Sequence, residues 1–172
     1  MNIDYKAIIR NVLILTFLIV IQKTFVWFIS LSQLNISPDF VIIALVYIGV
    51  REGKISGAVY GFVAGLLLDI LSGSFLGLLA LSYTIAIFVS GFFQTDNERF
   101  LVRFNFVIIV FAISIISNFI YFGLFFQGTP IVFSKVILLY ILPTSTYTTI
   151  ISLVYTIIPK RKGIDRSYIS ES

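Results

Sequence analysis

Residues 53–81 read GKISGAVYGFVAGLLLDILSGSFLGLLAL, and glycine recurs in this stretch at spacings of four. The row consists of Gly53, Gly57, Gly61 and Gly65, then Asp69, then Gly73 and Gly77. A step of four residues advances about 400° around an α-helix, so the row forms a slanted groove along the i±4n direction. Helices in lipid associate by close packing, which glycine permits because it has no side chain. The row therefore predicts that another helix packs tightly against it.

Two occupants of this groove stay open at the level of sequence. The link at residues 72–74 is very short, so the following apolar segment should form a helical hairpin with the glycine-bearing one. That segment has its own row of small residues at Gly77, Ser82, Ala86 and Ser90, and we expect the two small faces to meet. The alternative occupant is a helix of another subunit.

The composition places the chain in a membrane. Of its 172 residues, 59% are hydrophobic and 12% are charged, and the mean hydropathy is +1.06. Soluble domains are about 25% charged, which excludes a water-soluble fold. The net charge of +4 does not indicate nucleic-acid binding, because the basic residues flank apolar segments. The lack of Cys and His removes disulfides, thiol nucleophiles, zinc sites and imidazole bases.

Six apolar segments predict an all-α membrane protein, a six-transmembrane-helix bundle that forms one domain at residues 1–158. The segments span residues about 8–29, 38–50, 55–71, 75–93, 104–126 and 131–158. Pro143 interrupts the last segment and predicts a kink there. The remaining residues, 159–172, are expected to form a basic cytoplasmic tail.

The distribution of charge predicts that all six segments cross the membrane. The segment at residues 38–50 is short, about 20 Å as a helix, and could be re-entrant. If it crosses and the amino terminus is cytoplasmic, ten of the twelve basic residues face the cytoplasm: Lys6, Arg10, Arg51, Lys54, Arg99, Arg103, Lys160, Arg161, Lys162 and Arg166. If it does not cross, only Lys6 and Arg10 do. The positive-inside rule favours the first topology, with both termini cytoplasmic.

Three polar side chains are expected inside the membrane: Lys23, Asn118 and Lys135. Lys23 and Asp69 should lie at similar depth, and a lone buried charge is costly, so we expect them to pair. Lys135 is the alternative cation for Asp69. Snorkelling of these charges to the membrane interface explains their positions equally well.

The tripeptide Ser37–Pro38–Asp39 opens the second segment and has the features of a helix amino end. Ser is a good N-cap, Pro suits the first turn, and Asp opposes the positive end of the helix dipole. Whether a partner protein also binds this outer edge stays open. Asp39 and Asp69 both have structural explanations, so the sequence predicts no enzyme, no catalytic residue, no metal site and no cofactor.

Residues 61–81, GFVAGLLLDILSGSFLGLLAL, resemble the signature of the MreD family, the rod shape-determining membrane proteins of bacteria. The resemblance rests on Gly61–Phe62, Gly65–Leu66, Leu68–Asp69, Ser72–Gly73, Gly77–Leu78 and Ala80–Leu81. Pro38–Asp39 at the start of a short helix is similar as well. Leu79 departs from the pattern, because relatives often have a polar residue there, so a polar side-chain contact is not expected at that position.

This resemblance implies a role in the complex that elongates the cell wall from the bacterial cytoplasmic (inner) membrane. The partner would be MreC, a single-pass protein, with indirect links to MreB filaments, a glycosyltransferase and a transpeptidase; a homodimer stays open. The fold would resemble the substrate-binding component of energy-coupling-factor transporters. The residues expected to serve helix packing or partner binding are Gly53, Gly57, Gly61, Gly65, Asp69, Ser72, Gly73 and Gly77, together with the edge at Asp39.

The alternative function is a vitamin-binding membrane component of an energy-coupling-factor transporter. Such a protein needs a cavity with several convergent polar groups. The candidates for that lining are Gln22, Lys23, Asn118, Tyr121 and Gln127.

Overall fold

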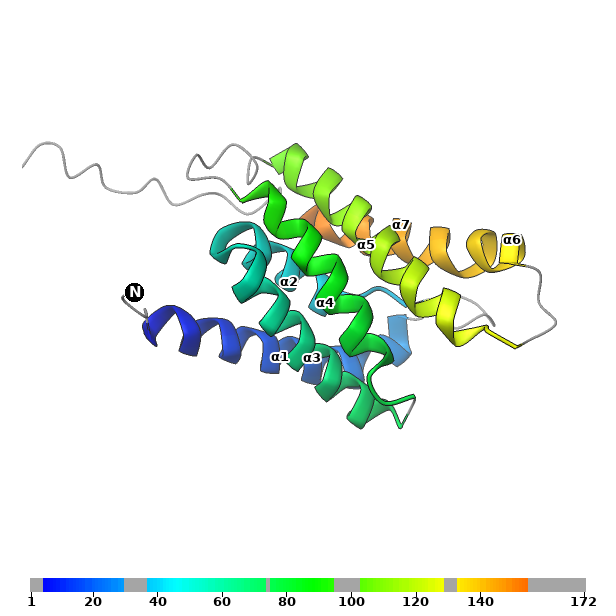
Figure 1. Ribbon diagram of the computed structural model, residues 1–172, viewed down its shortest axis with the longest axis horizontal. Helices are drawn as coiled ribbons and strands as arrows, with labels where there is room; N and C mark the ends of the chain where they lie inside the picture. Colours follow the sequence, from blue (N-terminus) through cyan, green and yellow to red (C-terminus); the bar gives the residue numbers. More distant parts are fainter. Residues whose placement is uncertain (1–4, 30–36, 74, 95–102, 129–132, 155–172) are drawn as a thin grey trace, which may run out of the picture.

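The computed structural model describes residues 5–29, 37–73, 75–94, 103–128 and 133–154 and contains no strand within them (Figure 1). Its helices are α1 (Tyr5–Ile29), α2 (Phe40–Glu52), α3 (Lys54–Ser72), α4 (Leu78–Ser90), α5 (Arg103–Phe125), α6 (Phe133–Val136) and α7 (Leu142–Ser152). A π-helical stretch, Ile137–Ile141, joins α6 to α7. The described chain therefore has six helical segments, which is the number that the sequence predicts. The expected tail at residues 159–172 lies outside the described residues.

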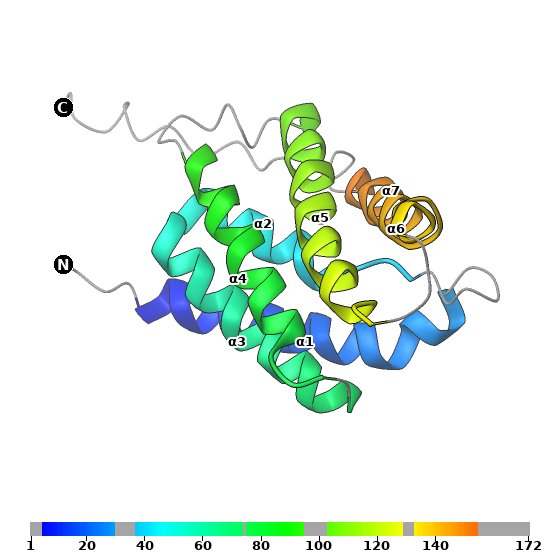
Figure 2. The ribbon, with the colours of Figure 1, turned by 45° about the vertical axis from the view of Figure 1, so that its right-hand side comes forward.

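The helical segments lie side by side, and successive segments run in opposite directions (Figures 1 and 2). The most extensive contact between any two elements joins α3 to α4, which form a helical hairpin. A second pair, α5 and α7, packs on the other side of α4 and α2. This arrangement places the α3–α4 hairpin and the start of α2 around one end of the bundle.

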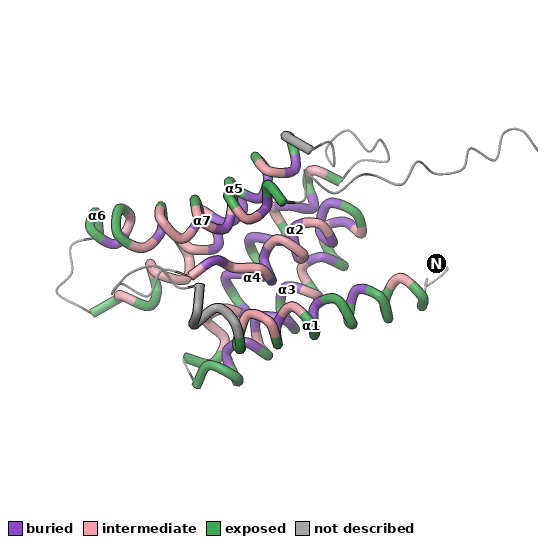
Figure 3. The backbone as a smooth tube through the Cα atoms, turned by 180° about the vertical axis from the view of Figure 1, so that it is seen from behind, coloured by how far each residue is buried: buried purple, intermediate pink, exposed green. Residues whose placement is uncertain are grey.

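Helix α2 forms the centre of the core. Val41, Leu45 and Val46 are each 0% exposed, and α2 contacts α1, α3, α4, α5 and α7. Figure 3 shows its residues as mostly buried or intermediate, whereas α1 is largely exposed. Because protein rather than lipid surrounds α2, its 13 residues do not have to match the thickness of a bilayer.

Among the residues that the structure describes, three helices are long and apolar enough to span a membrane: Tyr5–Thr24, Lys54–Ser72 and Asn105–Phe125. The helical stretch Leu78–Phe93 is apolar but shorter. These helices expose large apolar side chains such as Phe17, Val59 and Ile108, as lipid-facing helices do. By length and composition, three of the six predicted segments are thus candidates to cross the membrane among the described residues. That the other three segments cross it stays a prediction.

Two segments differ from their expected form for local reasons. The fourth was expected from residue 75, but α4 begins at Leu78, because Phe75 to Gly77 form a turn in which the Leu78 N–H donates to the Phe75 carbonyl at 3.2 Å. The sixth contains the π-helical stretch directly before Pro143. Proline has no N–H and its ring clashes with the carbonyl four residues earlier, and a wider helical turn accommodates both effects.

Candidate functional site

The glycine row of α3 lies directly against α4. A Cβ atom added to Gly65 would lie 2.6 Å from Ala80 Cα, and one added to Gly61 would lie 3.0 Å from the carbonyl oxygen of Tyr83. Side chains do not fit at such distances, so the missing Cβ atoms are what allow the two backbones to meet. Gly57, Gly61 and Gly65 are all buried. The groove is occupied by the next helix of the same chain, and a helix of another subunit would have to displace α4 to enter it.

At its first residues the row packs against α2. A Cβ atom on Gly57 would lie 2.8 Å from Gly49 Cα of α2, whereas one on Gly53 would lie 2.5 Å from Oε1 of Gln94, which follows α4. Gly53 ends α2 by donating its N–H to the Gly49 carbonyl at 3.0 Å, and it accepts from the Gly57 N–H at 2.9 Å. A single residue thus joins two helices, which turns α3 back alongside α2.

Asp69, the next member of the row, caps the amino end of α4. Its Oδ2 accepts from the N–H groups of Gly77 at 2.9 Å and Ala80 at 3.2 Å, and its two oxygens lie 3.1 and 3.2 Å from the Leu79 nitrogen. Gly77 at the N-cap has no side chain, so α3 supplies the carboxylate that α4 needs. The contact at Leu79 uses the backbone and does not depend on the side chain there. Asp69 is 1% exposed, and its charge opposes the positive helix end.

The corner of the α3–α4 hairpin is exposed and turns on two glycines. Gly73 has a φ of +61° and Gly77 a φ of +93°, and an added Cβ atom would meet nothing within 4 Å at either position. Both are glycine because of their left-handed backbone and not because of crowding. Ser72 and Gly73 are exposed and form a surface that a partner can reach.

Two of the three polar residues expected inside the membrane, Lys23 and Asn118, make contacts between helices. Lys23 Nζ donates to Ser72 Oγ, one turn beyond Asp69, while both oxygens of Asp69 accept from the backbone of α4. The hydrogen bond described for Lys23 is thus with Ser72, while the Lys23 ammonium also interacts electrostatically with Asp69, and their direct pairing stays a prediction. Asn118 Nδ2 donates to Ser145 Oγ at 3.0 Å and links α5 to α7, whereas Lys135 is exposed on α6.

Asp39 is the N-cap of α2. Its Oδ1 accepts from the Ile42 N–H at 3.0 Å, and its Oδ2 accepts from the Tyr83 hydroxyl of α4. Pro38 beside it is buried and Ser37 is half-buried. The N-cap is therefore Asp39 and not Ser37, and α2 begins at Phe40 and not at Pro38 as the residue types suggest, because the Asp39 carboxylate accepts the N–H that a cap must satisfy. Asp39 also contacts a helix far along the chain.

Other helices complete the amino end of α2. The Asp39 N–H donates to Thr148 Oγ1 of α7 at 3.0 Å, and the Val41 N–H donates to Gln22 Oε1 of α1 at 3.0 Å. The first N–H groups of a helix have no partner within the helix, so these side chains provide acceptors that the apolar core lacks. The start of α2 is therefore held by α1, α4 and α7.

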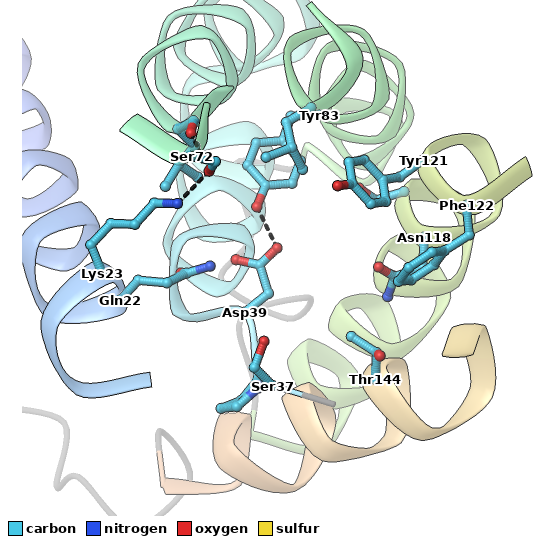
Figure 4. A pocket seen from close by; sticks show the side chains of 14 residues that line it. Gln22, Lys23, Ser37, Asp39, Ser72, Tyr83, Asn118, Tyr121, Phe122 and Thr144 are labelled. Carbon is cyan, nitrogen blue, oxygen red and sulfur yellow. Dashed lines mark hydrogen bonds between the residues drawn. The ribbon is translucent and has the colours of Figure 1, made fainter. Parts of the chain in front are cut away.

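A polar pocket of about 340 Å³ lies beside Asp39, between α1, α3, α4, α5 and α7 (Figure 4). Its lining consists of Gln22, Lys23, Ser37, Pro38, Asp39, Leu68, Ser72, Leu79, Tyr83, Ser117, Asn118, Tyr121, Phe122 and Thr144. Lys23 and Gln22 reach toward it from α1, and Asn118 and Tyr121 from α5 (Figure 4). A volume in the range of about 300–1,000 Å³ suits a small molecule, and the mixed amides, hydroxyls and charges can bind one through hydrogen bonds.

The sequence indicated part of this lining. Of the five candidates for a small-molecule cavity, four line the pocket: Gln22, Lys23, Asn118 and Tyr121. Gln127 is exposed and is not among the lining residues. Tyr83, Ser117 and Thr144 also line the pocket but were not predicted. The position of a hydroxyl group along an apolar helix does not indicate which residues of other helices lie next to it. Tyr83, for example, meets a carboxylate 44 positions away.

A model of a known protein family matches most of the chain. The family model described as rod shape-determining protein MreD matches residues 5–159, which extends from α1 beyond α7. No curated protein and no solved structure matches the chain.

Proposed function

The chain belongs to the MreD family of rod shape-determining membrane proteins, and from this premise we propose that it is a non-enzymatic component of the bacterial cell-wall elongation complex. In this role it binds the single-pass protein MreC, and through MreC it connects to MreB filaments, a glycosyltransferase and a transpeptidase. The observation that carries the proposal is the family match over residues 5–159. The helical fold with three membrane-spanning candidates supports it.

In this proposal all six helical segments cross the cytoplasmic membrane, and both chain ends are cytoplasmic. The basic residues support this orientation. Lys6 and Arg10 are in the first turns of α1, Arg51 and Lys54 flank the α2–α3 junction, and Arg103 begins α5. Because successive segments alternate in direction, these positions belong to one end of the bundle, and positive charge favours the cytoplasmic side.

The α3–α4 hairpin is the surface that we assign to MreC. An apolar groove of about 330 Å³ runs along its outer face and is lined by Ile55, Ala58, Val59, Phe62, Thr84 and Phe88. Its small residues, Ala58 and Thr84, leave room between two phenylalanines for a transmembrane helix. The exposed Ser72–Gly73 corner lies at the other end of the hairpin from Ile55, at the outer end in this proposal, where the extracytoplasmic part of a single-pass partner would begin.

Site-specific crosslinking in membranes tests this proposal. A photoreactive residue at Val59, which is 58% exposed in the groove, should capture MreC when both proteins are produced together. The matched control is Ile108 on α5, which is 66% exposed and lies outside the groove. If MreC is captured from Ile108 but not from Val59, it binds at α5 and not at the α3–α4 hairpin. Capture from neither residue would contradict the proposal that MreC binds to the hairpin.

The pocket beside Asp39 supports a second candidate function, the binding of a small polar molecule as in the vitamin-binding component of an energy-coupling-factor transporter. Four of the side chains expected for such a cavity line it. The test is mass spectrometry of molecules that co-purify with the wild type and with the Asn118→Ala and Tyr121→Phe variants. A molecule that is retained by the wild type and lost from both variants would favour this function, whereas no co-purifying molecule would count against it.

A further inference from the structure

On one side of the polar pocket beside Asp39, the charged groups are already bonded within the protein. Lys23 Nζ donates to Ser72 Oγ and interacts electrostatically with Asp69. The two carboxylate oxygens of Asp39 accept from the backbone of α2 and from the Tyr83 hydroxyl of α4. Both charged side chains that line the pocket therefore have protein partners before any ligand enters.

The opposite side of the pocket, formed by α5 and α7, has neutral groups with unused hydrogen-bonding capacity (Figure 4). Within the part of the chain that the structure describes, the side-chain hydroxyls of Ser117, Tyr121 and Thr144 make no hydrogen bond. Asn118 donates to Ser145 through Nδ2, which leaves its Oδ1 able to accept. The Tyr121 hydroxyl points into the pocket (Figure 4). These groups can bind a molecule without breaking a contact of the protein.

The charges that line the pocket favour an uncharged ligand. Lys23 contributes an ammonium group and Asp39 a carboxylate to the same lining. A cation in the pocket would lie near Lys23 and an anion near Asp39, so a ligand of either sign meets a like charge. A ligand without charge avoids both repulsions, and it avoids the cost of removing an ion from water.

The unused groups favour a ligand that carries several hydroxyls. A hydroxyl both donates and accepts, as those of Ser117, Tyr121 and Thr144 do, so the two sets can pair in either direction. Phe122 adds an apolar ring face, against which the C–H groups of a small ring can pack. The volume of about 340 Å³ is at the lower end of the range of about 300–1,000 Å³ for ligand sites, so it suits one ring better than an extended chain.

We propose that this pocket binds an uncharged, hydroxyl-rich ring such as a hexose, held by the hydroxyls of α5 and α7. The proposal deepens the second candidate function, on which it rests, because it names the chemical class of the small molecule. It does not depend on MreC binding at the α3–α4 hairpin. A free sugar and the headgroup of a glycolipid present the same hydroxyls, so the two sources share this chemistry.

Saturation-transfer difference NMR on the protein in phosphatidylcholine nanodiscs tests the charge of the ligand. Glucose should bind about tenfold more tightly than glucosamine, which is a cation, and than glucuronate, which is an anion, because like charges oppose each charged ring. Tighter binding of either charged ring, or of the zwitterion alanine, would overturn the proposal. The pocket would then still bind a small molecule, so the second candidate function would not fail with it.

Two variants test the hydroxyls that hold the ring. Tyr121→Phe and Thr144→Val each remove one hydroxyl and nearly keep the shape of the side chain, and each should weaken glucose binding about fivefold. The matched control is Tyr60→Phe, which removes a hydroxyl of α3 outside the pocket and should leave binding unchanged. If one variant does not fold, the other supplies the comparison. An effect no larger than that of Tyr60→Phe would overturn the assignment to this pocket.

Native mass spectrometry on nanodiscs that contain monoglucosyldiacylglycerol distinguishes the two sources of the ring. If the headgroup of a glycolipid is the ligand, the wild type should retain this lipid and Tyr121→Phe should retain less of it. If a free sugar is the ligand, glucose should bind while the glycolipid is not retained. Both results support an uncharged, hydroxyl-rich ring. Binding of neither glucose nor the glycolipid would overturn the proposal.

Discussion

Asp39 and Asp69 are both aspartates that cap the amino end of a helix inside an apolar bundle, but they do so over different distances along the chain. Asp39 directly precedes α2 and accepts from the Ile42 N–H, three residues later. Asp69 is in α3 and accepts from N–H groups of the next helix, eight to eleven residues later. The first cap is local, and the second exists only when the hairpin is closed.

The difference between the two caps shows that the α3–α4 hairpin is stabilised near its corner by a side chain of α3 that caps α4. Helix α2 would retain its own cap if its neighbours moved, whereas α4 has Gly77 at its N-cap and therefore no capping side chain of its own. The glycine row lets α3 and α4 approach closely enough for Asp69 to reach three N–H groups. The close packing of α3 against α4 and the capping of α4 by Asp69 thus depend on each other. Four substitutions should show how much each contact and each aspartate cap contributes to stability.

The largest effect is expected from Asp69→Ala. It leaves the buried N–H of Ala80 and those of Gly77 and Leu79 without their acceptor, at a cost of about 3 kcal/mol in the free energy of unfolding. Unfolding by SDS titration in mixed micelles measures it. The control Asp69→Asn keeps one accepting oxygen and should cost less. Equal stability of the wild type and Asp69→Ala would show that the cap contributes nothing.

Gly65→Ala should come next. Its added Cβ atom would lie 2.6 Å from Ala80 Cα, so α3 and α4 must separate, which costs about 2 kcal/mol by overpacking. The matched control is Gly123→Ala in α5, where the added atom would be 3.8 Å from Phe133. In the same titration the control should be neutral or slightly stabilising, since alanine favours helix. A Gly65→Ala variant as stable as Gly123→Ala would contradict the close contact.

Asp39→Ala should cost about 1.5 kcal/mol, less than Asp69→Ala, because α2 keeps the acceptors Gln22 and Thr148. Asp39→Asn retains an accepting oxygen for the Ile42 N–H and should preserve most of the stability. The comparison between the two aspartates would fail if Asp39→Ala proved more destabilising than Asp69→Ala in parallel titrations.

The smallest effect is expected from Tyr83→Phe, which removes one hydroxyl donor from Asp39 and should cost about 1 kcal/mol. A double-mutant cycle of Tyr83→Phe with Asp39→Ala measures the coupling between them. The double variant should be barely less stable than Asp39→Ala alone. Strict additivity would mean that the hydroxyl acts independently of the carboxylate.

Much of the site was predictable where the cause is local. The tripeptide 37–39 correctly predicts a helix amino end, but it predicts Ser37 as the N-cap, whereas the structure has Asp39 in that role. Polar residues in apolar segments indicated five candidates for a cavity, and four of them line one: Gln22, Lys23, Asn118 and Tyr121, but not Gln127. The helix count followed from hydropathy, and the start of the fourth helix was displaced by a turn that hydropathy does not report.

The sequence by itself determined that the chain is an apolar helical protein, that α3 has a groove for a close neighbour, and that the chain matches the MreD family. Only the tertiary structure decided that α4 fills the groove, that Asp69 caps α4, and that α2 lies in the core. The physical reason is that spacing along one helix determines what a face can accept. Which helix packs against that face depends on the packing and hydrogen bonding of all the helices together.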